Sequence, residues 1–279
     1  MALSVLTNVA SLNAQRNLNK TQMDLSASIG RLSSGLRINS AADDAAGLGI
    51  SESLKSSIRS IGQAQRNTND AISMSQVAEG AMNEMQGIVS RMRELSVQSA
   101  NSTLGATERG YIHTEFKELS SEIDRISSVT NFNNQKLLDG SASTGLTFQV
   151  GIQNSANDRL AMSITKLTSS TLGSTVKLSA ATLSTVAGAQ AAMGVFDKAI
   201  QQLSQARAKV GSTQNRMQVT ISNLATSHEN LSAANSRIRD VDMASETAQL
   251  TKAQILSQAG LAVLGQANQL PSAALKLLG

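Results

Sequence analysis

The chain has 279 residues and a formal net charge of +4, with no cysteine, no tryptophan and a single proline. Four phenylalanines and one tyrosine offer almost no aromatic surface for base stacking, which argues against nucleic-acid binding. No stretch reaches the ~18 uninterrupted apolar residues of a membrane span. The first residues also lack the basic and apolar regions of a cleavable signal peptide.

So few helix breakers predict a small number of long helices rather than a compact globule. The first helix is expected over the N-terminal residues up to Ser33–Gly35, because serine and glycine stop helices. Ser40 with Asp43 three residues later predicts a capping box that starts the second helix. The apolar residues of the first helix recur at spacings typical of a coiled-coil seam. They are Leu18, Leu25, Ile29, Leu32 and Leu36.

The second helix is expected from about residue 44 to residue 100. At 1.5 Å per residue it would be roughly 80 Å long and would need another long helix beside it. A third helix is expected over about 107–128. The seam of the second helix combines large apolar residues with alanines and methionines that recur every seven positions. Its members are Leu54, Ile58, Ile61, Ala64, Thr68, Ala71, Ile72, Ala78, Met82, Met85, Val89 and Met92.

The pattern changes after residue 131. Apolar residues alternate over 146–150 and again over 160–164, which predicts a β-hairpin within about 140–165. The segment of about 166–186 is rich in Ser and Thr and is expected to be a surface junction.

The partner of the second helix is expected near the C-terminal end of the chain, where large apolar residues recur every seven positions with small residues three positions beyond most of them. Alternating large and small residues allow helices to approach closely. The heptad residues are Phe196, Leu203, Val210, Met217, Leu224, Leu231 and Ile238.

A final apolar segment, about 244–278, adds Leu256 and Leu264 as candidate seam residues.

Catalytic chemistry has little support. His113 and His228 are the two histidines, and no second histidine follows His228 at the spacing of a zinc-protease motif. Both are expected on helix surfaces. The acidic pairs Asp43–Asp44 and Asp240 with Asp242 are better explained as helix-start charges than as paired catalytic carboxylates. No enzyme activity, metal or cofactor is predicted.

Several strings closely resemble bacterial flagellin, the subunit of the flagellar filament. They are Arg31 to Gly47 (RLSSGLRINSAADDAAG), Ser11 to Leu18 (SLNAQRNL), Ser236 to Ala244 (SRIRDVDMA) and Gln266 to Pro271 (QANQLP). The resemblance covers nearly all of residues 1–165 and 190–279. The large outer domains that many flagellins carry between the two halves are missing, so the chain resembles a minimal, core-only flagellin.

The resemblance implies a mainly α fold, a long antiparallel coiled-coil rod with a small β-hairpin region between its halves. It implies a terminal coiled-coil domain from residues 1–44 with 236–279, which forms the inner tube of a filament. Residues 45–235 would form a surrounding helical domain. Because the terminal seams have little to pack against in a monomer, we expect their ordering to be coupled to assembly.

The implied function is that of a structural subunit that polymerises into the helical filament for swimming motility. Its partners would be copies of itself, the export apparatus and a chaperone, and the filament cap and junction proteins. The implied location is extracellular, after export through the type III apparatus of the flagellum.

The resemblance also implies a surface for recognition by a receptor. Arg91, Leu95 and Gln98, with Glu115 on the next helix, match the flagellin patch that a vertebrate Toll-like receptor recognises, a patch that also packs between subunits. The simpler explanation is an exposed helix face with Met92 turned inward.

Three rivals stay open at this point. A hook–filament junction protein has ends that resemble those of flagellin. A chemoreceptor signalling domain would share the heptads, but the predicted hairpin and the apolar final helix argue against it. An enzyme is the third rival, and the scarcity of catalytic residue types argues against it.

Overall fold

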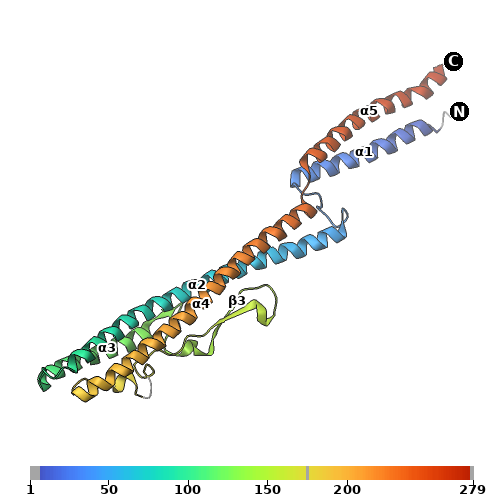
Figure 1. The fold of residues 1–279 in the computed structure, drawn as a ribbon. Coiled ribbons are helices and arrows are strands. Elements are labelled where there is room, and N and C mark those ends of the chain that lie inside the picture. Colours follow the sequence, from blue (N-terminus) through green and yellow to red (C-terminus); the bar gives the residue numbers. More distant parts are fainter. Residues whose placement is uncertain (1–6, 174–175, 277–279) are drawn as a thin grey trace. The chain divides into compact units, whose positions relative to one another are not determined.

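Long α-helices make up most of the computed structural model, which describes residues 7–173 and 176–276 (Figure 1). In chain order, the α-helices among the described residues are α1 (Val9–Ser34), α2 (Ala45–Ser99), α3 (Ala106–Val129), α4 (Val186–Arg239) and α5 (Met243–Lys276). The three helices expected before residue 130 are therefore confirmed. The C-terminal heptads belong to α4, and the final apolar segment is α5.

The chain divides into two compact units. Residues 1–58 with 229–279 form the terminal unit, and residues 59–228 form the central unit. Helices α2 and α4 contribute residues to both. Of the two expected domain boundaries, the one after residue 44 lies at the turn before α2, and the one before residue 236 lies inside α4.

In the terminal unit, α1 and α5 lie side by side and run in opposite directions (Figure 1). The side chain of Asn8 donates to the carbonyl of Ala267 at 2.8 Å, and Arg31 lies 3.7 Å from Glu246. The contacts therefore pair the start of α1 with the distal part of α5, and the end of α1 with the start of α5.

The central unit has one main core, formed between α2, α3 and α4. Met82, Met85 and Val89 of α2 are completely buried, as are Phe196 and Leu203 of α4. Small side chains are buried beside these large ones. The buried alanines of α2 and α4 are Ala64, Ala71, Ala78, Ala189, Ala192, Ala199 and Ala206.

Two small antiparallel pairs of strands follow α3. Strands β1 (Asn131–Phe132) and β2 (Gln135–Lys136) are joined by Asn133 and Asn134, both with positive φ, as a tight hairpin turn requires. The predicted hairpin is confirmed as β3 (Leu146–Gln149) and β4 (Arg159–Met162). Short 3-10 helices lie at Ser141–Thr144, Ala156–Asp158 and Leu178–Ala180.

The Ser/Thr-rich segment after the hairpin is not simply a surface junction. Leu167, Leu172, Leu178 and Leu183 are buried and join the main core. Polar contacts also fix the segment. The Ser169 amide and hydroxyl donate to Asp124, and Gln202 of α4 exchanges hydrogen bonds with the backbone of Gly173. The sequence signal for this burial is a leucine at every fifth or sixth position among the serines and threonines.

Candidate functional site

The contact between α1 and α5 is a two-helix seam built largely from small residues. Ser28 is 5% exposed, Ala253 and Ala267 are 6% exposed, and a Cβ added at Gly260 would lie 3.3 Å from Cδ1 of Leu18. The helices therefore approach too closely for large side chains at every seam position. The buried and half-buried positions follow the three-and-four spacing of a heptad. Those with this spacing are Ser11, Ala14, Leu18, Thr21, Leu25, Ser28 and Leu32 in α1, and Glu246, Leu250, Ala253, Ser257, Gly260, Leu264 and Ala267 in α5.

Two of the predicted seam residues lie outside this contact. Ile29 is 51% exposed and Leu256 is 49% exposed. The seam position next to each is occupied by a serine, Ser28 or Ser257. Choosing the larger apolar residue gave the wrong position here, because close packing at this seam requires the smaller one.

Leu36 also lies outside the helical seam, because α1 ends before it. Gly35 adopts a left-handed conformation (φ 72°), and its amide donates to the carbonyl of Arg31, as the predicted stop signal requires. Leu36 instead forms an isolated antiparallel bridge with Asp240. The Arg37 amide donates to Arg239 at 2.6 Å, and the Val241 amide donates to Gly35 at 3.0 Å. The chain leaving α1 is thus paired with the chain entering α5.

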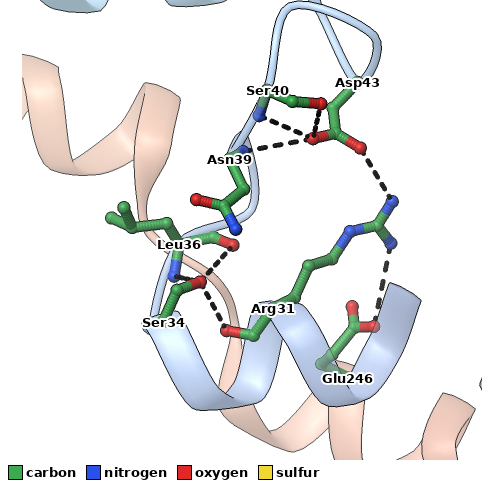
Figure 2. A network of polar contacts seen from close by, with 7 residues as sticks. All are labelled: Arg31, Ser34, Leu36, Asn39, Ser40, Asp43 and Glu246. Atoms are coloured by element: carbon green, nitrogen blue, oxygen red, sulfur yellow. Dashed lines mark hydrogen bonds and ion pairs between the residues drawn. The ribbon is translucent and has the colours of Figure 1, made fainter. Parts of the chain in front are cut away.

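The loop between α1 and α2 is closed by Asp43 (Figure 2). Its carboxylate accepts hydrogen bonds from the Asn39 amide, the Ser40 amide and the Ser40 hydroxyl. The hydrogen bonds from Ser40, with that from Asn39, hold the pKa of Asp43 below its ordinary value. Ser40 and Asp43 therefore close a turn, and the prediction that they cap α2 is wrong. The cap is Asp44, whose side chain accepts from the Gly47 amide at 2.9 Å.

Arg31 connects that loop to α5 (Figure 2). Its guanidinium lies 3.9 Å from Asp43 and 3.7 Å from Glu246. Glu246 is 5% exposed, and its Oε1 accepts no hydrogen bond within the part of the chain the structure describes. The cationic partner of this buried carboxylate is Arg31. The network is therefore an electrostatic link between α1, the loop and α5.

The start of α2 and the end of α4 are joined within the same unit. The Ser51 hydroxyl donates to the Asn235 side chain at 2.9 Å, and Arg239 forms an ion pair with Glu52. Neither contact follows from heptad spacing, because Asn235 and Arg239 each lie one residue beyond a heptad position of α4. Leu231 and Ile238, two of the predicted heptad residues, are half-buried here.

The rest of the α4 heptad lies in the central unit and is not uniformly buried. Phe196, Leu203, Val210 and Met217 are at most 1% exposed. Leu224 is half-buried and lines a groove of about 600 Å³ with residues of β4 and of the loop before it. The sequence predicts these positions equally, whereas packing by α3 and the hairpin distinguishes them.

The surface matched to receptor recognition is only partly exposed. Arg91 pairs with Glu115 at 3.0 Å and with Glu94 at 3.2 Å, and the hydrogen bond to Glu115 raises the pKa of Arg91. Gln98 is also exposed. Leu95, in contrast, is completely buried in the main core. It therefore cannot be a surface contact in this structure, and its contribution is to packing.

The residues described contain no cluster of histidine, cysteine or acidic side chains that could hold a metal ion. In that same part of the chain, no helix is long and apolar enough to cross a membrane. His113 is half-buried rather than a simple surface residue. Its ring stacks on Phe116 with 5.8 Å between centroids, and Nδ1 accepts from the Leu183 amide at 3.4 Å.

The outward faces of α1 and α5 carry exposed large apolar side chains among polar ones. Val9 is 61% exposed, Leu12 51%, Ile255 61% and Val263 56%. Each of these side chains would lose contact with water if another molecule packed against that face. The class defined by these features is a helical structural protein whose two ends pair with each other.

Family models identify the particular family. Residues 5–143 match the bacterial flagellin N-terminal helical region, and residues 193–278 match the bacterial flagellin C-terminal helical region. This chain belongs to the bacterial flagellin family, whose members are structural proteins rather than enzymes.

Individual relatives agree. A flagellin of Halalkalibacterium halodurans is 44% identical over 97% of this chain and 98% of its own length. A flagellin of Bacillus subtilis is 42% identical with the same coverage. A solved structure described as a flagellar hook-associated protein from Vibrio parahaemolyticus covers 71% of this chain and 100% of its own, with a TM-score of 0.59 and 13% identity. That likeness concerns the fold alone.

The chain is a structural subunit of the bacterial flagellar filament. The relatives at 42–44% identity match almost end to end and are flagellins, so the junction-protein alternative is not favoured.

Proposed function

We propose that the terminal unit is the part through which copies of this chain join into the filament, with the paired α1 and α5 as its inner layer. The observation that carries this proposal is the division of apolar residues between two faces. One face of each helix is used in the α1–α5 seam, while Val9, Leu12, Ile255 and Val263 stay exposed. Their contact with neighbouring copies would bury them.

A filament requires two different patches that bind each other without closing into a ring. The outward faces of α1 and α5 differ in sequence and therefore supply two non-identical surfaces. The network of Arg31, Asp43 and Glu246, with the Leu36–Asp240 bridge, would hold both faces in a constant relation within this unit. The predicted assembly residues Leu18, Leu25, Leu32 and Leu264 would act indirectly, by maintaining the pair.

The proposal also covers how the subunit is exported and where it is located. The subunit would leave the cell through the type III apparatus of the flagellum, with a chaperone before export and the cap and junction proteins at the filament ends. Family membership supports this route. The mature location would be the extracellular filament.

We also propose that Arg91, Gln98 and Glu115 form part of a surface that a vertebrate Toll-like receptor can contact. All three are exposed, and the ion pair of Arg91 with Glu115 presents α2 and α3 together. If neighbouring subunits also cover this surface, only the monomer would be recognised. Arg91→Ala should then weaken receptor binding by monomers, and an unchanged response would contradict the assignment.

Polymerisation of purified protein tests the main proposal. Wild-type protein should form long filaments visible by electron microscopy. The double variant Ile255→Ser/Val263→Ser should raise the critical concentration at least tenfold, equivalent to about 1.4 kcal/mol per added subunit. The matched control is Ile152→Ser, which removes an exposed isoleucine from the central unit. Normal assembly of the double variant would refute the role of the outward face, and absence of wild-type filaments would refute self-assembly by this chain alone.

A further inference from the structure

Methionine side chains differ sharply in exposure along this chain. Met74, Met82, Met85, Met92, Met162 and Met217 are buried, and Met193 is half-buried. In the described part of the chain, the exposed methionines are Met23 of α1, 66% exposed, and Met243 at the start of α5, 53% exposed. A dissolved oxidant would therefore reach these two sulfur atoms first.

The two exposed methionines have different surroundings. Met23 lies two residues before the seam residue Leu25, which places it about 200° around the helix and thus on the outward face. Its side chain is the more exposed of the two. Met243 instead follows Asp242, whose side chain accepts from the amides at the start of α5. It belongs to the turn region.

We propose that Met23 is an oxidation site that controls assembly of this chain. The inference rests on the proposed function, because it requires the outward face of α1 to be buried between copies. Hydrogen peroxide transfers one oxygen atom to the thioether sulfur, which is oxidised by two electrons to the sulfoxide, while the peroxide is reduced to water. The flexible apolar side chain becomes polar, and burying it between subunits becomes unfavourable.

The exposure of Met23 makes its oxidation depend on whether the chain is a monomer or part of a filament. In the monomer, Met23 is open to solvent, so peroxide reaches it freely. In the filament, the neighbouring copy would cover it. Oxidation would therefore act on subunits before they assemble and spare those already in the filament. Methionine sulfoxide reductases reverse the reaction, so the block would be reversible.

The experiment uses the full chain and compares Met23→Leu with the matched control Met243→Leu. Monomers are treated with hydrogen peroxide, sulfoxide at each methionine is measured by peptide mass spectrometry, and the critical concentration is measured by sedimentation. Oxidised wild type and Met243→Leu should need at least tenfold more protein to assemble, whereas Met23→Leu should change less than twofold. Met23→Gln, which is polar without any oxidant, should raise the critical concentration of untreated protein.

Two further results bear on the inference. Peroxide should oxidise Met23 at least tenfold more slowly in filaments than in monomers, and equal rates would overturn the proposal. It would also be overturned if Met23→Leu lost assembly as fully as wild type, or if wild type oxidised at Met23 assembled normally. Failure of untreated wild type to polymerise would instead count against the proposed function.

Discussion

Leu203 and Leu224 occupy the same heptad position of α4, three heptads apart, but they should respond very differently to truncation. Leu203 is completely buried in the main core, whereas Leu224 is half-buried and lines the groove beside the hairpin. Both belong to the central unit. Replacing each by alanine removes the same atoms from two environments, so the comparison isolates the effect of packing.

The magnitude follows from burial. Truncating a fully buried leucine costs roughly 2–5 kcal/mol, because the transfer free energy is lost and a cavity remains. At Leu224, part of the side chain already contacts water and the groove needs no new cavity, so about 1 kcal/mol is expected. A change of 1 kcal/mol shifts the melting temperature by roughly 2–4 °C in a unit of this size. Leu203→Ala should therefore lower it by about 4–20 °C, and Leu224→Ala by about 2–4 °C.

Thermal unfolding of monomers, followed by circular dichroism at 222 nm, measures both shifts under the same conditions. Chemical denaturation provides an independent free energy of unfolding. Aspartate variants sharpen the contrast, because Leu203→Asp would bury an unpaired carboxylate and should unfold the unit, whereas Leu224→Asp should remain folded. Equal shifts for the two alanine variants would show that Leu224 is packed as tightly as Leu203, which would contradict the structure.

Three other perturbations have clear expected outcomes. Gly151→Val should distort the hairpin and give straight or abnormally coiled filaments, because a Cβ there would overlap the Asp158 side chain; normal waveform and switching under the light microscope would contradict this. Removing the chain from Gly260 onward should abolish polymerisation while the melting transition of the central unit persists, since α1 loses its partner; filaments from the truncated chain would refute it. Burial lowers the pKa of His113, so the folded state binds protons less readily than the unfolded chain, and stability should fall as the pH drops below about 6.5. His113→Gln, which can still accept from the Leu183 amide, should lose that pH dependence in thermal melts, and an unchanged slope would argue against the assignment.

Much of this protein follows from its sequence. The helices could be predicted because their signals are local: few breakers, apolar heptads, and Gly35 as a stop that the structure confirms as a left-handed cap. The β3–β4 hairpin also followed from alternation over five residues on either side of a polar turn. Sequence motifs such as RLSSGLRINSAADDAAG indicated the family, and with it the function. This was possible without the fold, because the function of a filament subunit does not depend on the geometry of a catalytic site.

Only the tertiary structure decided which apolar residue of a neighbouring pair enters the seam and which stays exposed. Ser28 is buried and Ile29 is not, because the distance between α1 and α5 admits a small side chain at that position. Heptad spacing likewise could not distinguish Leu203 from Leu224, since burial depends on elements far away in the chain. The burial of Leu95 and the pairing of Glu246 with Arg31 have the same cause. Each depends on which helices pack against each other, and that cannot be read from the neighbouring residues in the sequence.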